Sequence, residues 1–455
     1  MKGLFVQTYG CQMNASDSDR MKATLAPLGY QNVKTPENAD LILINTCSIR
    51  EKAENKLTSF AHEMKAFKQL NPDLVLGVTG CVAQQEKENI LRNLPFIDLV
   101  LGPDNIDELP WMLEELKQTS QPVARAEFDG DDSRVWHTQT KLLNPGVSSF
   151  ISVMKGCDHF CSYCVVPFTR GREKSRPISE ILVDVRQLVS QGVKEVTFLG
   201  QNINTFGKRC GESLQELFQR AHDVEGLERI RFTTSHPGDL KDELIRCFEE
   251  LPKLCSSFHL PVQSGSDKIL RAMRRFYTRA QYLERVAALR QARADISFST
   301  DIIVGFPGET EEDFEATCSL AAEVKFENAY SFLYSARPGT SASTRSDSTS
   351  ETRKLERLTR LQTALQKNSK DLHVAQIGQV RQVLLESPSK KDPTKLTGRT
   401  SQNVPVHVDF DEGLKIGDLI DVLIHDATLT HLRGRLHQGP TLRYLSTSPS
   451  AVDRI

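Results

Sequence analysis

The sequence of 455 residues lacks any apolar run approaching the roughly 20 residues that a membrane-spanning helix requires. Its first residues, MKGLFVQTYGC, contain neither the apolar stretch of a signal peptide nor the arginine-rich amphipathic pattern of an organelle transit peptide. These absences argue against a membrane protein, a secreted scaffold and an imported precursor. We therefore expect a cytoplasmic protein.

An excess of one charge sign is also missing, because 57 basic and 59 acidic residues leave a formal net charge of −2. No global positive field indicates a nucleic-acid partner, so any such binding must use local patches. Hydrophobic residues at 39% and charged residues at 25% exclude a disordered chain. The length predicts about three domains.

A disulfide framework is not expected either. The chain has ten cysteines but no export signal, and a reducing cytosol keeps thiols free. The cysteines are then metal ligands, catalytic thiols or small buried hydrophobic residues.

Residues 1–120 predict an N-terminal doubly wound α/β domain. Short apolar segments alternate there with helix-like stretches that open with polar or acidic residues. Such alternation is typical of a parallel sheet covered on both faces. The predicted strands are 4–8, 41–46, 74–80 and 97–102. The acidic segment 121–147, which contains Gly and Pro, is interpreted as an interdomain connection.

A second series of strands and helices predicts a full or partial α/β barrel over residues 148–372, linker helix included. Reactive groups in such a barrel belong at the C-terminal strand ends. The predicted strands are 150–156, 195–201, 229–235, 256–262, 296–306 and 328–334. From 375 to 440, short alternating segments punctuated by Gly and Pro predict a small β-barrel.

The motif KGCDHFCSYC places Cys157, Cys161 and Cys164 directly after the first strand of the predicted barrel. Three closely spaced thiolates on an irregular loop suit three corners of an iron–sulfur cubane. Structural zinc, with His159 as a fourth ligand, is an alternative, and ordinary thiols are another. A cubane with three cysteines has one iron without a protein ligand, which indicates chemistry rather than electron transfer alone.

This loop resembles the signature of radical S-adenosylmethionine (radical SAM) enzymes. The resemblance implies that SAM chelates the open iron and is cleaved by one electron to a 5′-deoxyadenosyl radical. It also implies that Tyr163 lies against the adenine, although ordinary packing in the loop is an alternative.

A second triad consists of Cys11, Cys47 and Cys81, each of which follows a predicted strand in QTYGC, LINTC and VTGC. The C-termini of parallel strands share one sheet edge, so these cysteines could converge on one crevice. We therefore expect a second three-cysteine cluster, with three isolated buried thiols as the alternative. Four further cysteines show no ligand spacing and are expected to pack: Cys210, Cys247, Cys255 and Cys318.

The segments YGCQMNASDSDR, NTCSIREKAENK and GCVAQ resemble the methylthiotransferase family, over nearly the whole chain. The triplet QMN at 12–14 favours the branch acting on N(6)-dimethylallyladenosine in tRNA over the threonylcarbamoyladenosine and ribosomal-protein branches. GRTSQN within the final predicted barrel resembles the RNA-binding TRAM module. That barrel holds eight basic and eight acidic residues, so its RNA binding is implied by the resemblance and not by charge.

Further segments that match the family follow predicted barrel strands, where cofactor contacts belong. Strand-end capping and turn chemistry are the alternative explanation of these residues. The residues that the resemblance implies near SAM or substrate are Gly200, Gln201, Ser235, Gln263 and Asp301.

Two basic segments are candidates for RNA contact, because guanidinium groups suit phosphates and aromatic rings stack on loop bases. A solvated helix face is the alternative. The first segment offers Arg170, Arg172, Lys174 and Arg176. The second offers Arg271, Arg274, Arg275 and Arg279, with Phe276 and Tyr277 interleaved.

The resemblance implies methylthiolation of carbon 2 of N(6)-dimethylallyladenosine at position 37 of tRNA. It implies two SAM molecules per turnover, two [4Fe–4S] clusters, the tRNA anticodon stem-loop as partner, and an electron donor such as a flavodoxin or ferredoxin. We expect a monomer. The alternatives are a methylthiotransferase for another tRNA base or a ribosomal protein side chain, and a non-catalytic iron–sulfur carrier or RNA-binding regulator.

Overall fold

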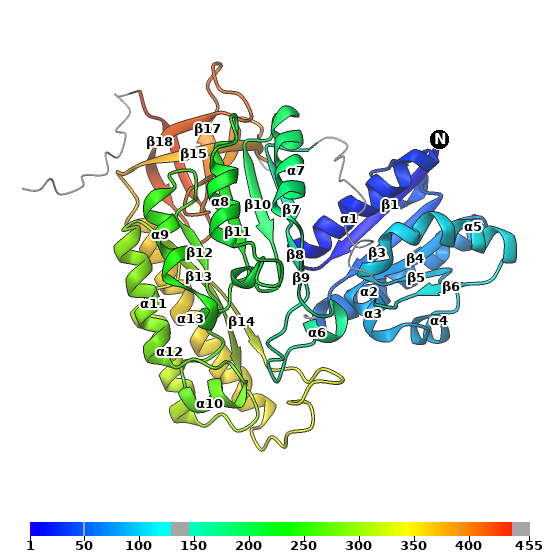
Figure 1. Ribbon diagram of the computed structural model, residues 1–455, viewed down its shortest axis with the longest axis horizontal. Helices are drawn as coiled ribbons and strands as arrows, with labels where there is room; N and C mark the ends of the chain where they lie inside the picture. The colour runs from blue at the N-terminus through cyan, green and yellow to red at the C-terminus, as the bar shows by residue number, and fades with distance from the viewer. Residues whose placement is uncertain (49–50, 129–144, 391, 439–455) are drawn as a thin grey trace, which may run out of the picture. The chain divides into compact units, whose positions relative to one another are not determined.

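The computed structural model describes all residues except 49–50, 129–144, 391 and 439–455 (Figure 1). The chain divides into two compact units, Met1–Ser369 and Lys370–Ile455. Among the described helices, none has the length and apolar character needed to cross a membrane.

The first unit begins with a six-stranded sheet in which every neighbouring pair of strands is parallel. In spatial order its strands are β2 (Tyr30–Asn32), β1 (Lys2–Tyr9), β3 (Leu41–Thr46), β4 (Val75–Gly80), β5 (Leu99–Leu101) and β6 (Val123–Arg125). The four predicted strands are confirmed. The edge strands β2 and β6 were not predicted, because their sequences, YQN and VAR, lack the apolar run that marks the equally short β5 (LVL). Strand β6 lies at the start of the segment interpreted as a connection.

Helices cover both faces of this sheet, which confirms the doubly wound architecture. The helices are α1 (Gln12–Leu25), α2 (Glu51–Leu70), α3 (Cys81–Glu86), α4 (Asn89–Asn93) and α5 (Leu109–Thr119). On β3, Leu43 belongs to the core cluster that contains Met21 of α1, whereas its neighbour Ile44 belongs to the cluster that contains Met64 of α2. Successive side chains of a strand point to opposite faces, so α1 and α2 lie on opposite sides.

The second part of this unit is a six-stranded parallel half-barrel, as predicted. Its strands are β7 (Ser148–Ser152), β10 (Glu195–Leu199), β11 (Arg229–Thr233), β12 (Ser257–His259), β13 (Ser297–Val304) and β14 (Asn328–Leu333). The two three-stranded halves meet at a parallel bridge between Ile230 and Leu254. A short antiparallel pair, β8 (Met154–Lys155) and β9 (Lys174–Ser175), frames the cysteine loop.

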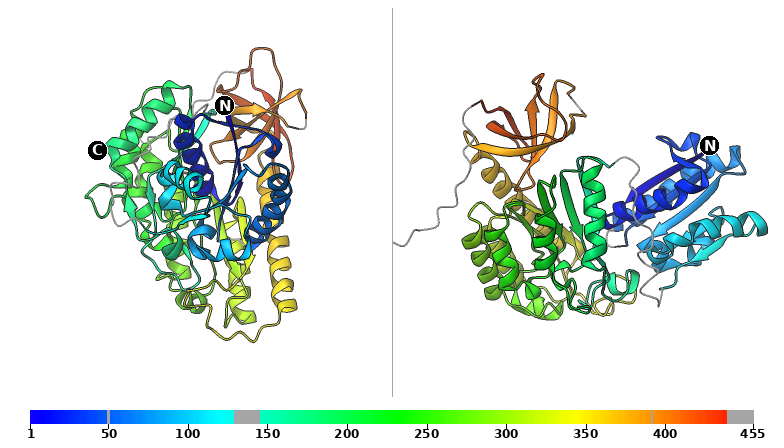
Figure 2. Two further views of the ribbon diagram at one scale, coloured as in Figure 1. Left: turned by 90° about the vertical axis from the view of Figure 1, so that its right-hand side faces the viewer. Right: turned by 45° about the horizontal axis from the view of Figure 1, so that its top comes forward.

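The helices of the half-barrel lie along the outer side of its strands (Figures 1 and 2). They are α7 (Ile178–Ser190), α8 (Leu214–His222), α9 (Asp242–Glu250), α11 (Arg279–Ala292), α12 (Glu311–Val324) and α13 (Glu351–Val374). Two shorter helices, α6 (Val166–Thr169) and α10 (Asp267–Ala272), lie in loops that follow strands. This leaves the C-terminal strand ends to the loops.

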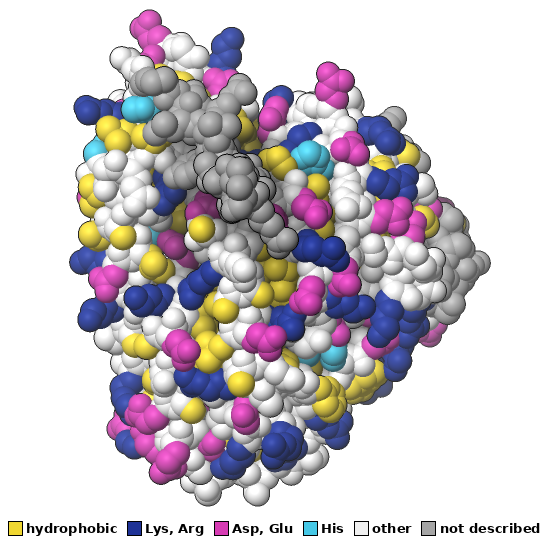
Figure 3. Space-filling view, turned by 60° about the vertical axis from the view of Figure 1, so that its left-hand side comes forward, with side chains coloured by type: hydrophobic (Ala, Val, Ile, Leu, Met, Phe, Trp, Pro, Cys, Tyr) yellow, Lys and Arg dark blue, Asp and Glu magenta, His cyan; other side chains and the backbone are white. Residues whose placement is uncertain are grey.

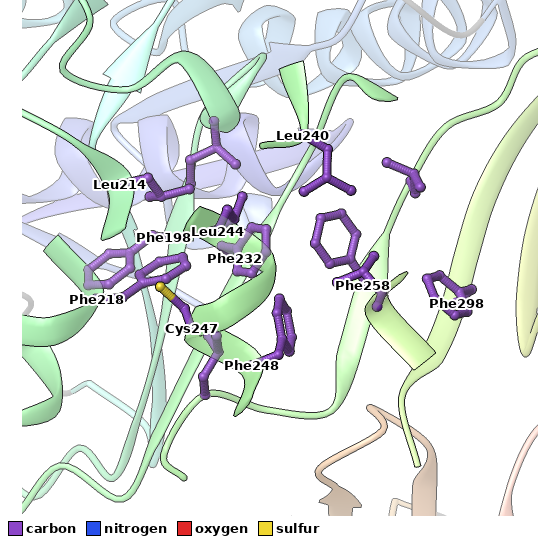
Figure 4. Packing of buried hydrophobic residues seen from close by; sticks show 14 of the residues in the cluster. Phe198, Leu214, Phe218, Phe232, Leu240, Leu244, Cys247, Phe248, Phe258 and Phe298 are labelled. Atoms are coloured by element: carbon purple, nitrogen blue, oxygen red, sulfur yellow. The ribbon is translucent and has the colours of Figure 1, made fainter. Parts of the chain in front are cut away.

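Phenylalanines fill the space between these strands and helices (Figure 4). Phe232 lies 5.2 Å from Phe258 in an edge-to-face arrangement, and Phe248 packs beside both. Cys247 is buried in this core, as predicted, whereas the prediction is wrong for Cys210, which is exposed.

The second compact unit contains a closed five-stranded barrel, as predicted. Its strands, in the order β15–β16–β17–β19–β18, bury Val383, Val406 and Val422. Their bounds are β15 (Val380–Pro388), β16 (Lys395–Thr400), β17 (Pro405–Asp409), β18 (Leu419–Ala427) and β19 (Leu432–Leu436).

On the face shown in Figure 3, basic and acidic side chains are interspersed, in keeping with the balanced composition.

Candidate functional site

The N-terminal triad lies on three neighbouring strand ends. Tyr9 of β1 pairs with Thr46 of β3, and Thr46 pairs with Gly80 of β4, so these three strands end in one row. Cys47 and Cys81 are the next residues after β3 and β4, and Cys11 is the N-cap of α1. The tertiary structure thus brings the three cysteines to one edge of the sheet.

This edge is also where the order of the sheet reverses. Strand β1 is followed by β2 on one side and lies against β3 on the other, and the helices after β1 and β3 cover opposite faces. Helices that diverge at such a switch point leave a crevice beyond the strand ends, which is where doubly wound folds bind ligands. Cys11 and Cys47 lie at this point.

The three thiols interact with one another and with a buried cation. The hydrogen bond that Cys47 donates, together with the positive charge of Arg170, lowers the pKa of Cys11 to about 6. Burial raises the pKa of Cys81, although Arg170 Nε lies 3.2 Å from its sulfur and opposes that rise. Because the thiolate is the metal-binding form, these neighbours suit a metal centre.

Two asparagines that the sequence reasoning missed hold this site together. Asn14 Nδ2 donates to Asn45 Oδ1 at 2.9 Å, and Asn45 Nδ2 donates to the Asn14 carbonyl at 2.7 Å. Both side chains are fully buried, so the pair ties the start of α1 to the end of β3. They stand in the motifs QMN and NTC, which could have drawn attention to them.

The second triad lies on the loop between β8 and α6. The loop is fixed by backbone contacts: Cys157 N donates to the Gly171 carbonyl at 3.2 Å, and Ser162 N donates to the Met273 carbonyl at 3.0 Å. Gly156, just before Cys157, has a φ of +77°, and its N–H donates to Gln201 Oε1 at 2.5 Å.

Burial dominates the chemistry of these thiols. It raises the pKa of Cys157 to about 11 and that of Cys164 to about 12, and the charge of Cys161 adds to both shifts. Arg275 opposes the shifts, with Nη1 3.7 Å from Cys161 Sγ. Thiols of this kind ionise when a metal replaces the proton.

In this structure, neither cysteine triad has the close spacing expected of ligands to a single zinc ion. Thiolates on one zinc ion, with Zn–S of about 2.3 Å, lie about 3.8 Å apart. Within the described part of the chain, the group whose ligand atoms all lie within 4.8 Å of one another is His159, His236 and Asp239, and neither cysteine triad meets that spacing. A cluster takes one thiolate per iron, so its ligands lie farther apart than those of one ion.

His159, the alternative zinc ligand, makes other contacts. Its Nε2 lies 2.5 Å from Asp239 Oδ2, and its ring stacks on His236 at 3.8 Å between centroids. Burial lowers the pKa of His236, whose Nδ1 accepts from Gly238 N at 3.1 Å. This neutral ring therefore carries its proton on Nε2. A polar pocket of about 390 Å³, lined partly by His159, Glu173 and Asp239, adjoins the group.

Unsatisfied polar atoms gather at the ends of β10 and β11, beside this loop. Buried polar groups in a folded protein normally have partners, so such a gathering points to a ligand. Among the described residues, five of the buried side-chain atoms without a hydrogen-bond partner are Gln201 Nε2, Asn202 Oδ1, Asn204 Oδ1, Ser235 Oγ and His236 Nε2. These donors and acceptors fit a polar cofactor such as SAM. The sequence reasoning named Gln201 and Ser235 but not the other three.

The other residues predicted to lie near SAM or substrate are not part of this group of unsatisfied polar atoms. Gly200 is a close-packing position, because a Cβ there would lie 2.5 Å from Met154 Cγ. Gln263 and Asp301 lie together on the other half of the barrel, where Gln263 N donates to the Asp301 carbonyl at 2.8 Å. Tyr163 packs against a small core that contains Phe306, the alternative given above for this residue.

Several predicted RNA contacts are wrong. Arg170, Arg176 and Arg275 are each more than nine-tenths buried, as is Tyr277. Arg176 pairs with Asp184 at 2.8 Å, and the other two arginines lie against cysteine sulfurs. A guanidinium enclosed in this way cannot reach a phosphate.

The exposed members of the same segments remain candidates. Arg172, Arg271 and Arg274 are exposed, and Phe276 is 76% exposed. Arg274 and Phe276 both have positive φ angles, which turn alternate side chains of this short segment outward while Arg275 turns inward.

Comparison with known proteins agrees with this architecture. Family models match residues 3–102 (uncharacterized protein family UPF0004), 151–321 (radical SAM superfamily) and 374–437 (TRAM domain). Most of the chain also resembles solved structures in its fold. TsrM, a radical S-adenosylmethionine methyltransferase from Kitasatospora setae, has a TM-score of 0.58 at 14% identity, covering 75% of this chain and 77% of that one. The cobalamin-dependent S-adenosylmethionine radical enzyme OxsB has a TM-score of 0.51 at 10% identity, covering 81% and 56%.

A cysteine loop on this half-barrel, within the matched region, defines a radical SAM enzyme. Relatives over nearly the full length are named tRNA-2-methylthio-N(6)-dimethylallyladenosine synthase. The Myxococcus xanthus protein is 46% identical, covering 98% of this chain and 97% of its own length, and the Geobacter sulfurreducens protein is 47% identical, covering 96% and 97%. The chain belongs to this family of tRNA methylthiotransferases.

Proposed function

We propose that this chain replaces the hydrogen on carbon 2 of N(6)-dimethylallyladenosine at position 37 of tRNA with a methylthio group, using two SAM molecules. The observation that carries the proposal is the presence of two separate cysteine triads in one compact unit, each at the C-terminal edge of a parallel sheet. Abstraction of an unactivated hydrogen and delivery of sulfur are different tasks, and they need different sites.

In this proposal Cys157, Cys161 and Cys164 hold one [4Fe–4S] cluster with an iron open to SAM. When the cluster and SAM are both bound, they supply the one-electron cleavage of SAM to a 5′-deoxyadenosyl radical. The cation of Arg275, 3.7 Å from Cys161, offsets the negative charge of the thiolates. The unpaired His236 Nε2–H offers a donor to the polar groups of SAM.

Cys11, Cys47 and Cys81 hold the second cluster, which carries the sulfur that is to be methylated and inserted. The low pKa of Cys11 favours its metal-binding form, and the buried Asn14–Asn45 pair keeps the start of α1 and the end of β3 together. The crevice beyond these strand ends gives that cluster a position open to substrate.

The substrate partner in this proposal is the tRNA anticodon stem-loop, bound in part by the TRAM barrel. The match of residues 374–437 to the TRAM domain supports that role. We also propose that the chain acts as a cytoplasmic monomer and receives electrons from a flavodoxin or ferredoxin.

The proposal is tested in anaerobic reactions with prenylated tRNA, a chemical reductant and SAM, measuring iron, 5′-deoxyadenosine and modified nucleoside together. Wild-type protein should hold about eight irons and form both products. Replacing the three loop cysteines by Ala should leave about four irons and abolish both products. Replacing Cys11, Cys47 and Cys81 by Ala should also leave about four irons, but 5′-deoxyadenosine should persist while the methylthio nucleoside disappears.

The matched control replaces Cys210 and Cys318, which lie outside both triads, and should behave as wild type. Methylthio product at the wild-type level from the N-terminal triple variant would overturn the two-cluster assignment. Methylthiolation of threonylcarbamoyladenosine or of a ribosomal protein, but not of prenylated tRNA, would overturn the substrate assignment. Replacing the chemical reductant by reduced flavodoxin or ferredoxin tests the electron donor.

A further inference from the structure

Buried ion pairs tie both ends of the radical SAM loop to helical segments of the N-terminal domain. Lys155, two residues before Cys157, lies with Nζ 2.8 Å from Asp104 Oδ1. Arg170, six residues after Cys164, lies with Nη2 2.6 Å from Asp17 Oδ2. Side-chain exposure in the two pairs is 4–11%, so water hardly reaches either.

Arg170 makes a further contact that Lys155 does not. Its Nε–H donates to Cys81 Sγ at 3.2 Å, across 89 residues of sequence. One planar guanidinium therefore joins three helices: Asp17 lies on α1, Cys81 begins α3, and Arg170 follows α6. A guanidinium suits this role because its donors form a rigid fork, whereas an ammonium group is a point charge.

These contacts are costly to break singly. A charge left buried without its partner is strongly destabilising, so the pairs hold only in one arrangement of the N-terminal domain and the half-barrel. The hydroxyls of Ser16 and Ser152, 3.0 Å apart, add a third contact across the same boundary. A shift of the half-barrel as a whole against the N-terminal domain must disrupt all three contacts.

We propose that Arg170 is a positioning residue that fixes the N-terminal cysteine site relative to the radical SAM loop and stabilises the Cys81 thiolate as a ligand. The Lys155–Asp104 pair is the second tether of the same device. This role rests on the proposed function. The relative position of the two sites matters only if the radical made at the radical SAM loop acts on a substrate that receives sulfur from the N-terminal cysteine site.

Two consequences follow. A hydrogen bond and a positive charge at a ligand sulfur raise the reduction potential of a cluster, so loss of Arg170 should lower the potential of the N-terminal cluster. Loss of the tether should also uncouple the two sites. SAM cleavage should then continue while less of it leads to methylthio product.

The test compares Arg170→Gln with Arg176→Gln. Arg176 is a matched control, because it is as buried as Arg170 and pairs with Asp184 at 2.8 Å. Asp184 lies on α7 of the half-barrel, whereas the partner of Arg170, Asp17, lies on α1 of the N-terminal domain. Arg170→Lys keeps the charge without the fork. Iron content and the ratio of 5′-deoxyadenosine to methylthio nucleoside are measured in all three. The potential of the N-terminal cluster is measured by electron paramagnetic resonance titration, with the loop cysteines replaced by Ala so that one cluster contributes.

Arg170→Gln should raise the ratio of 5′-deoxyadenosine to methylthio nucleoside at least about tenfold, which is the size of effect that partners of metal ligands commonly have. Otherwise it should lose the N-terminal iron while keeping the loop iron. It should also lower the potential of any N-terminal cluster that it retains. Arg170→Lys should recover the potential in part but not the ratio. Equal potential, iron content and ratio in Arg170→Gln and Arg176→Gln would overturn the proposal. If no variant or wild-type protein forms methylthio product, the proposed function fails, and the potential and iron content still decide whether Arg170 stabilises the Cys81 ligand.

Discussion

Substitution of Gly156 by Ala should disable the radical SAM loop without unfolding the chain. Gly156 has a φ of +77°, and a Cβ at this position would lie 2.1 Å from the carbonyl oxygen of Arg172 and 2.6 Å from that of Gly171. Both atoms belong to the backbone that closes the loop, so neither can rotate away. The residue must therefore move, and Cys157 moves with it.

The magnitude has two parts. An L-residue in the left-handed region costs about 1–2 kcal/mol, and forcing an extra methyl group into a packed site costs about 1–3 kcal/mol more. The sum of about 2–5 kcal/mol is smaller than the roughly 5–15 kcal/mol that holds a domain folded. The protein should remain folded but relieve the strain at the loop, losing the Gly156 N–H bond to Gln201 Oε1.

Gly192→Ala is the matched control, because Gly192 has a φ of +96° with no atom within 4 Å of the added Cβ. It carries the backbone cost alone. Gly156→Ala should lower the melting temperature a few degrees more than Gly192→Ala, bring iron toward about four per chain and reduce 5′-deoxyadenosine formation at least about tenfold. Wild-type iron and 5′-deoxyadenosine in Gly156→Ala would refute the reasoning that the close approach at Gly156 sets the loop.

Three further outcomes are expected. Burial raises the pKa of Glu309 to about 7, so the folded state binds this proton more tightly than the unfolded state between about pH 4.5 and 7, and stability is lost as the pH rises through that window. Glu309→Gln stays neutral, so its stability relative to wild type should rise from pH 5 to pH 8 by at most about 3 kcal/mol. The same difference in melting temperature between the two proteins at both pH values would contradict this. Arg274→Glu and Phe276→Ala should weaken tRNA binding without changing iron content. Arg274→Glu should also lower the slope of log binding constant against log salt concentration by about one. Binding titrations unchanged from wild type at several salt concentrations would show that both residues belong to a solvated surface. Phe248→Ala should destabilise the half-barrel by about 3–5 kcal/mol in thermal melts, because its ring is fully buried among other aromatic rings, and a loss below about 1 kcal/mol would show that this core is not closely packed.

The sequence by itself determined most of the strands and the position of each triad cysteine after a strand. Strand 41–46 was predicted to the residue, because the four consecutive apolar residues of LILINT, just before Cys47, give a local signal. The same local reasoning placed Cys157 after the first barrel strand and predicted the closed barrel near the end of the chain. Hydrophobic pattern and turn chemistry depend on near neighbours, so they can be interpreted without tertiary structure.

Only the tertiary structure decided which strands are neighbours and which charges are buried. The order β2–β1–β3–β4 brings Cys11, Cys47 and Cys81 to one edge, and no local pattern specifies that order. Arg170 and Arg172 look alike in the sequence, yet Arg170 is buried against Cys81 and Arg172 is exposed. The burial of a charge depends on partners distant in sequence, which is why the sequence reasoning assigned Arg170 to RNA and the fold places it between the two cysteine sites.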